Sequence, residues 1–302
     1  MSEEVKIRRT FQVLNFGAGV QSTALYLMFR DGVIQHDGVP VQLDAAIFAD
    51  VQEEGRATYK HLEWLQSLNG PPILIRTTGK LGDDLISGRN STGQRFASIP
   101  AFLKTDSKGG GMGRRQCTKE YKIDVVERTI RRELVGLQPR QRMPKDIKVV
   151  QYFGLSYEEM RRVFRVQSRF LKVKWATPRF PLVEMGMTRE KCREYMVGRV
   201  PHEVPRSACV FCPYKRNDEW RRLRDTDPEG WARAVEIDRA IRLTTSLCAQ
   251  GLKAEQYLHR SLVPLEEADL SADKGEKKAA AHGFLEVGDG VEGSACEGMC
   301  GL

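Results

Sequence analysis

The first part of the chain alternates short apolar runs with segments of helical periodicity. The apolar runs at residues 11–16, 44–49 and 72–76 predict three buried strands. Between them, residues 23–30 and 58–68 repeat their apolar positions at the spacing of one helix face, and a glycine lies just beyond each segment. Strands that alternate with helices in this way predict an α/β fold with a doubly wound, mostly parallel sheet of Rossmann-like type.

The second part of the chain has a less regular pattern. Residues 79–113 are rich in Gly, Ser, Asn and Lys, a composition that predicts a mobile loop. The apolar spacing beyond this loop predicts helices at 118–137, 157–165 and 188–196, strands at 147–153 and 171–176, and two arginine-rich helical stretches up to about 247. From residue 266 onwards the chain is rich in Ala, Gly, Lys and Glu, which predicts a disordered tail.

Composition favours a protein without a membrane anchor. The 302 residues contain no apolar run near the roughly 20 residues of a membrane-spanning helix, and residues 1–6 do not have the pattern of a secretory signal. We therefore expect a cytoplasmic protein with no membrane partner. The chain has seven cysteines and is long enough to build a core without disulfides, so metal binding or redox chemistry explains them better.

The formal net charge of +8 is unevenly distributed. Lys and Arg outnumber Asp and Glu from residue 112 to residue 179, whereas acidic residues predominate from residue 266 to the end. Such an arginine-rich block is either a solvated helix surface or a surface that contacts the phosphates of a nucleotide or a nucleic acid. Aromatic residues are sparse within the block, which favours phosphate contacts over base stacking.

A glycine-containing turn joins the first predicted strand to the first predicted helix. Its residues are Gly17, Ala18, Gly19, Val20, Gln21 and Ser22. Such a turn directs backbone N–H groups toward one point at a helix N-terminus, where a phosphate or sulfate is stabilised, and the Ser22 hydroxyl can donate one more hydrogen bond. The turn matches neither the Walker A motif nor Gly-x-Gly-x-x-Gly, so a purely structural tight turn is the alternative.

Carboxylates follow the second predicted strand. Asp50 and Glu54 come directly after residues 44–49, at the strand end where open α/β sheets bind their ligands. Asp50 is a candidate catalytic residue, and both carboxylates are candidates for holding a ribose or a metal ion. The alternative is an acidic helix N-terminus, which accounts for Glu54 without a ligand.

Four segments resemble, in order, the PP-loop ATP pyrophosphatases, also called adenine nucleotide α-hydrolases. The turn at 17–22 resembles the family's Ser-Gly-Gly-x-Asp-Ser signature. Residues 50–59 resemble the Asp-Thr-Gly-x-Glu-x-x-x-Thr-Tyr segment of the phosphoadenosine phosphosulfate (PAPS) reductase branch. Residues 154–162 are similar to the family's later Gly-x-Arg segment, and residues 180–189 are similar to its Pro-Leu element before a helix.

The resemblance implies a nucleotide site and a domain order. It assigns ATP or PAPS, together with Mg²⁺, to the glycine turn and to Asp50, Glu54 and Gly154. The implied parts are a PP-loop nucleotide-binding α/β domain at 1–182, a cysteine-containing helical region at 183–265 and an acidic flexible tail at 266–302.

Three positions depart from the family pattern. Val20 and Gln21 stand where many members have Lys and Asp, and Ser156 stands where many have Arg. Glutamine at position 21 remains compatible with the reductase-like branch. The missing aspartate bears most on metal-assisted cleavage of ATP.

A Cys-x-x-Cys pair, Cys209 and Cys212, lies in the helical region, and Cys117 follows the glycine-rich loop. This spacing lets two thiolates reach one metal, and zinc or free thiols are both compatible with it. We expect nearby cations to lower the pKa of Cys117; they are Arg114, Arg115, Lys119 and Lys122. The arrangement is similar to that in PAPS reductase-like, DNA phosphorothioation and iron–sulfur tRNA thiolase enzymes, which implies a [4Fe-4S] cluster with these three ligands.

The remaining cysteines form two groups. Cys192 and Cys248 lie in helical patterns and are expected to be buried core thiols. Cys296 and Cys300 lie in the acidic tail, where a tethered thiolate can swing into an active site and attack sulfur. They are similar in place to the C-terminal catalytic cysteine of sulfonucleotide reductases, so both are candidate catalytic residues. An incidental pair in an exposed tail is the alternative.

Together these features predict an adenine-nucleotide-dependent sulfurtransferase that adenylates an acceptor and delivers sulfur to it. The arginine-rich block indicates tRNA or DNA as the acceptor, and the sulfur or the electrons would come from a donor protein. One alternative is a PAPS or adenosine phosphosulfate reductase that uses a tail cysteine. The other is a non-catalytic, metal-stabilised nucleic-acid-binding module on a degenerate nucleotide fold.

Overall fold

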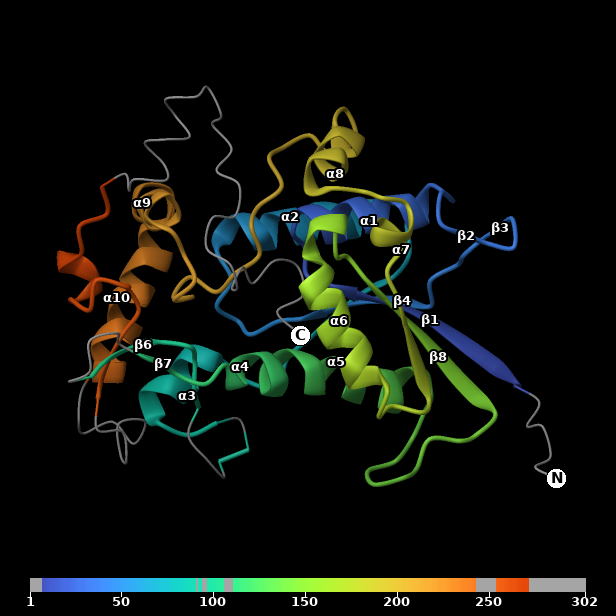
Figure 1. Ribbon diagram of the computed structural model, residues 1–302, viewed down its shortest axis with the longest axis horizontal. Coiled ribbons are helices and arrows are strands. Elements are labelled where there is room, and N and C mark those ends of the chain that lie inside the picture. The colour runs from blue at the N-terminus through green and yellow to red at the C-terminus, as the bar shows by residue number, and fades with distance from the viewer. Residues whose placement is uncertain (1–6, 91, 94–96, 106–110, 243–253, 272–302) are drawn as a thin grey trace.

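A five-stranded parallel sheet lies at the centre of the computed structural model, with its strands in the order β5-β4-β1-β8-β9 (Figure 1). The structure describes residues 7–90, 92–93, 97–105, 111–242 and 254–271. The strands are β1 (Arg9–Phe16), β4 (Ala45–Ala49), β5 (Ile73–Arg76), β8 (Ile147–Phe153) and β9 (Ala176–Arg179). Four of the predicted strands therefore form, at nearly the predicted residues.

Helices cover both faces of this sheet (Figure 1). Residues Leu14 and Phe16 of β1 belong to one apolar core, and the alternating Phe11 and Val13 belong to the other. The first core is covered by α1 (Val20–Arg30), α2 (Arg56–Ser67), α7 (Pro181–Glu184) and α8 (Arg189–Met196). The second core is covered by α5 (Asp124–Thr129) and α6 (Met160–Phe170). The predicted doubly wound α/β fold of Rossmann-like type is thereby confirmed.

The predicted helix at 118–137 is a continuous helical run that includes two π-helical turns. Its segments are α4 (Gln116–Thr118), η1 (Lys119–Ile123), α5 and η2 (Ile130–Leu134). A π-helical turn shifts the side chains that follow it around the helix axis, and such turns are frequent at functional sites. The first of them, η1, begins two residues after Cys117.

A third core joins residues of the predicted loop to the C-terminal helices. It contains Leu81 and Leu85 from α3 (Leu81–Ser87), together with apolar residues of α9 (Asn217–Thr226) and α10 (Pro228–Arg242). A small antiparallel sheet adjoins it, formed by β6 (Phe102–Lys104), β7 (Gly111–Met112) and β10 (Glu255–Tyr257). The described part of 79–113 thus contains one helix and two short strands among its loop segments, and β6 pairs both with the nearby β7 and with β10, much later in the chain.

Two further sequence expectations are corrected. The strand expected at 171–176 is β9, which begins only at its last residue, because α6 continues to Phe170 and Leu171 then turns into solvent. Residues 266–271 are packed rather than part of a flexible tail, since Leu270 is buried and the Asn217 amide donates to the Asp269 carbonyl oxygen. The smaller elements are β2 (Gln35–His36), β3 (Val39–Pro40), η3 (Tyr157–Glu159) and η5 (Leu265–Glu267).

Candidate functional site

The glycine turn lies where the sheet order reverses. β1 and β8 are neighbours in the sheet, but α1 and α6 after them cover opposite faces, which is the position at which open α/β sheets bind ligands. Gly154, directly after β8, packs on the turn from the neighbouring strand. A Cβ atom added there would lie 2.8 Å from Ser22 Cα and 2.9 Å from Ser22 N. Only glycine therefore permits this approach of the two backbones.

The turn itself is compact and largely buried. Ala18 has a left-handed backbone with φ of 56°, a conformation that normally favours glycine. Ser22 does not direct its hydroxyl outward as the sequence suggested, because this group donates to the Gly19 carbonyl oxygen (3.2 Å) and accepts from the Gly19 amide (3.1 Å). Any phosphate bound here would therefore rely on the first backbone amides of α1.

Two residues that depart from the family pattern contact each other. The buried Gln21 side chain donates from Nε2 to Ser156 Oγ (3.5 Å) and to Glu159 Oε2 (3.2 Å). Glu159 also accepts from the Ser156 amide (3.0 Å) and pairs with Arg162. A hydrogen-bonded polar network thus ties the start of α1 to the segment that leads into α6.

Asp50 stands at the carboxyl end of β4, as the sequence predicted. Its Oδ1 accepts from the Tyr59 hydroxyl (3.0 Å) and from the Gln52 amide (2.7 Å). Burial raises the pKa of the Asp50 carboxyl above its ordinary value, against the opposing effect of these two hydrogen bonds. The Glu54 amide donates to the same Tyr59 oxygen (3.3 Å), so Asp50, Glu54 and Tyr59 of the resembling motif form one connected unit.

Glu54 leads away from Asp50 toward the cysteines. Its fully buried carboxylate accepts from the Lys122 ammonium (3.4 Å) and from the Ser207 hydroxyl (3.3 Å). Residue 54 also forms an isolated backbone bridge with Cys209. Lys122 lies in the π-helical turn η1 and its pKa is raised, because the effect of Glu54 and of the nearby thiols exceeds that of burial. No local pattern predicted this ion pair, because its partners lie far apart along the chain.

Cys117, Cys209 and Cys212 come together around this ion pair. Burial raises the pKa of the Cys209 thiol well above its ordinary value, and Glu54 and the other two thiols raise it further. Cys212 also raises the pKa of Cys117. The expected lowering of the Cys117 pKa is wrong in direction: burial raises it, and Arg115 and Lys122 offset only part of that effect. Of the other expected cations, Lys119 instead pairs with Asp124 at 2.8 Å.

The donor chemistry of this cysteine centre, defined as Cys117, Cys209 and Cys212, suits a soft metal. Three thiols could ligate zinc or an iron–sulfur cluster, and Cys117 and Cys209 pack against the third apolar core. Among the described residues no three His, Cys, Asp or Glu side chains are arranged closely enough to hold one metal ion. Binding a metal at this centre would therefore require the thiols to draw closer.

The other cysteines follow the sequence expectation as far as they are described. Cys192 is completely buried in the first core, and burial raises the pKa of its thiol to about 12. It is thus an inert core residue. Cys248, Cys296 and Cys300 lie outside the described residues, so their expected roles remain predictions.

A contact between the buried His61 and the exposed His202 was not foreseen from the sequence. His61 on α2 contacts Thr23 of α1 through Nε2 (2.9 Å) and His202 through Nδ1 (2.8 Å). The His61 ring also stacks on Trp64 with ring centroids 5.6 Å apart. Burial, together with the nearby His202 ring, lowers the pKa of His61 to about 3. Thr23 follows the matched position Ser22 by one residue, and His61 follows the matched Tyr59 by two. Nothing in the local pattern indicated that Thr23 and His61 touch.

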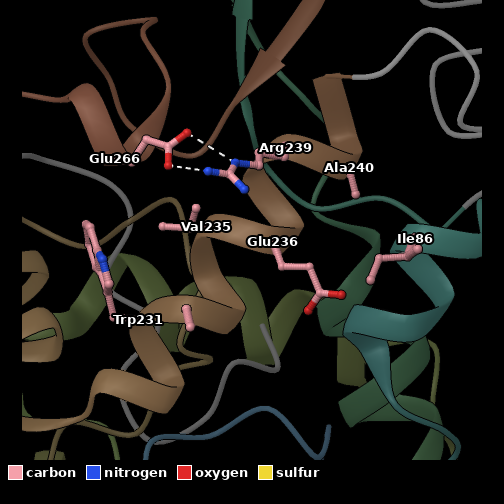
Figure 2. Close-up of a pocket in the computed structure, with 8 residues that line it drawn as sticks. Ile86, Trp231, Val235, Glu236, Arg239, Ala240 and Glu266 are labelled. Atoms are coloured by element: carbon pink, nitrogen blue, oxygen red, sulfur yellow. Dashed lines mark hydrogen bonds and ion pairs between the residues drawn. The ribbon is translucent and has the colours of Figure 1, made fainter.

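A pocket of about 490 Å³ lies away from these residues, between α3 and α10 (Figure 2). Figure 2 shows Trp231, Val235 and Ile86 on its walls, with an ion pair between Arg239 and Glu266 at one side. None of the residues predicted to bind nucleotide or metal lines it. The candidate reaction site is therefore the sheet edge and the cysteine centre.

Comparisons with known proteins add no relative. No family model, curated protein or solved structure matches this chain. Within the described residues, no helix combines the length and the apolar character needed to span a bilayer. The functional argument therefore depends on the geometry of the residues themselves.

Proposed function

We propose that this chain is an adenine-nucleotide-dependent sulfurtransferase of the PP-loop type, with a nucleic acid as acceptor. One observation carries the proposal: a single short segment after β4 serves both parts of the site. Asp50 begins this segment at the sheet edge, and Glu54 ends it in contact with Lys122 and beside Cys209. A nucleotide at the switch point and a sulfur-bearing group at the cysteine centre would thus be held by one rigid connection.

In this proposal, different residues of the chain bind the phosphates, hold the ribose or Mg²⁺ and act on the thiols. The first amides of α1 would stabilise the departing pyrophosphate, since helix N-termini favour negative charge. Asp50, oriented by Tyr59 and by the Gln52 amide, would hold the ribose or Mg²⁺ at the sheet edge. Lys122 places a positive charge beside the thiols, which opposes part of the burial effect that raises the pKa values of Cys117 and Cys209.

A metal group at the cysteine centre completes the proposal. A [4Fe-4S] cluster held by Cys117, Cys209 and Cys212 would supply a site for sulfide, whereas zinc would hold the centre together structurally. The three thiols lie close enough for Cys212 to raise the pKa values of both Cys117 and Cys209. The chemistry of the three donors supports this assignment, and metal analysis tests it.

The decisive experiment follows the fate of ATP. Full-length protein, purified without oxygen, is incubated with α-labelled ATP, a sulfide source and pooled RNA or DNA. Formation of AMP and pyrophosphate that depends on the nucleic acid supports the proposal. Asp50→Asn should lower this rate by about 100-fold or more if Asp50 holds the reacting groups, whereas the exposed control Asp37→Asn should not change it.

Other outcomes identify the alternatives. Release of sulfite from PAPS in the presence of a thiol donor identifies a sulfonucleotide reductase instead. Absence of AMP formation with every acceptor, combined with nucleic-acid binding that does not respond to nucleotide, supports the non-catalytic module and contradicts the sulfurtransferase.

A further inference from the structure

The outer face of α6 carries an unusual combination of exposed side chains. Phe164 is 59% exposed and Leu171, just after the helix, is 84% exposed. Tyr157, one turn before the helix, is 56% exposed. Large apolar groups normally occupy the buried face of a surface helix, where α6 already places Val163, Val166 and Phe170. The exposed rings on the opposite face therefore call for a function.

Arginines share this outer face. Arg161 lies three residues before Phe164 and four before Arg165, so these three side chains project from one side of the helix. Tyr157 lies four residues before Arg161, in η3. Arg161 and Arg165 are both exposed. The α6 sequence contains no acidic residue. Arg162 pairs with Glu159, and Arg169 pairs with Glu127.

This face adjoins both parts of the candidate site. At its N-terminal end, Glu159 accepts a hydrogen bond from Gln21 at the start of α1. Farther along, the Arg165 cation acts on Tyr214, whose ring also carries the Arg115 guanidinium 5.5 Å from its centroid. Tyr214 follows Cys212 by two residues. A ligand on α6 would consequently lie near the glycine turn and the cysteine centre together.

We propose that the outer face of α6 binds a single-stranded segment of RNA, with Phe164 and Tyr157 stacking on bases and Arg161 and Arg165 contacting phosphates. The inference deepens the proposed function, on which it rests, by naming the surface and the form of the acceptor. Aromatic rings interleaved with arginines are the surface that binds unpaired nucleotides, because every base presents a stacking face and every nucleotide carries a phosphate. RNA exposes such unpaired bases in its loops.

The arrangement does not suit two other anionic partners. A helix that lies on a membrane separates its apolar and basic residues onto opposite faces, whereas α6 mixes them on one. A nucleic-acid duplex keeps its bases stacked internally, so the exposed Phe164 ring would find no base face to contact.

The test measures binding of a fluorescently labelled, unstructured RNA of about 16 nucleotides to the full-length protein at several salt concentrations. Phe164→Ala should weaken binding about tenfold without changing the salt dependence, because it removes stacking only. Arg165→Ala should weaken binding and reduce the slope of log K against log salt by about 0.7, the value for one phosphate contact on a single strand. Matched exposed controls on the opposite side of the sheet, Val197→Ala and Arg199→Ala, should bind as the parent protein does.

Several outcomes overturn the proposal. They are equal binding by parent and Phe164→Ala, tighter binding of the corresponding DNA strand or duplex than of the RNA, and binding to phosphatidylserine vesicles that Phe164→Ala abolishes. The assay needs no ATP turnover and no bound metal. A protein that forms AMP but binds RNA independently of α6 therefore refutes this surface while leaving the proposed function intact.

Discussion

The Lys122 ammonium lies 3.4 Å from a carboxylate oxygen of Glu54, whose side chain is completely buried, while that of Lys122 is 15% exposed. The pair joins η1, in the helical run that contains Cys117, to the segment after β4. Burying two charges is costly, and the cost is repaid only while both partners are present. Loss of either partner should therefore lower the stability of the protein and disturb the geometry of the cysteine centre.

Removing one partner should destabilise the protein strongly. Lys122→Met leaves the Glu54 carboxylate buried without its cation, and we expect a loss of about 3–5 kcal/mol in the free energy of unfolding measured with urea. The exposed control Lys119→Met, which loses only a surface pair with Asp124, should cost less than about 1 kcal/mol. Adding Glu54→Gln to Lys122→Met should restore part of the loss. No recovery in the double variant would show that the buried charge is not the cause.

Filling the space at Gly154 should disturb the glycine turn. In Gly154→Ala the new Cβ would press on Ser22 backbone atoms 2.8 and 2.9 Å away, which cannot move like a flexible side chain. We expect a loss of about 1–3 kcal/mol in stability, together with weaker ATP binding in calorimetry at a temperature where the variant is folded. At the control position Gly111 a Cβ meets only Leu103 side-chain atoms at 3.5 Å or more. Gly111→Ala should therefore bind ATP normally; equal loss in both variants would contradict the role of Gly154.

The buried His61 should make stability depend on pH. Its pKa falls from 6.5 to about 3 on folding, so the unfolded chain binds a proton that the folded protein excludes. Above pH 6.5 His61 is neutral in both states, so its burial costs no stability there. As the pH falls from 6.5 toward 3, the unfolded chain takes up the proton and the protein loses stability progressively. Between pH 7 and pH 5 we expect a loss of about 2 kcal/mol from this group.

The comparison that isolates this effect uses His61→Gln. Urea unfolding at pH 7 and at pH 5 should show a difference about 2 kcal/mol smaller in this variant than in the parent. His36, which is exposed, provides the control, and His36→Gln should keep the parent's pH dependence. The same pH dependence in His61→Gln as in the parent would rule out His61 as its source.

The cysteine centre should determine metal content. Protein purified without oxygen is expected to contain iron and acid-labile sulfide, or zinc, measured by elemental analysis and visible absorption. Cys117→Ser, Cys209→Ser and Cys212→Ser should each lose most of this metal, since a thiolate ligand is removed. Cys192→Ala, in the first core, should retain it. Parent protein without iron or zinc would contradict the metal assignment.

The sequence anticipated the sheet because the relevant signals are local. Residues 11–16 and 147–153 are apolar runs, and their burial on both faces follows from helices on either side. Asp50 and Gly154 could be placed for the same reason, since each directly follows a strand whose carboxyl end reaches the ligand edge. The local pattern did not predict the strand β6 within residues 79–113, because β6 pairs with β10, which lies far along the chain.

By itself, then, the sequence determined the parallel α/β core and the position of the glycine turn, since apolar periodicity and glycine placement act within a few residues. The Cys-x-x-Cys spacing and Cys117 also indicated which three cysteines to group as the cysteine centre. Only the tertiary structure decided that Glu54 pairs with Lys122, that His61 meets His202 and that Phe164 faces solvent beside Arg165. It also reversed the expected pKa direction of Cys117. The physical reason is that burial and electrostatic pairing depend on neighbours in space, which a local pattern does not contain.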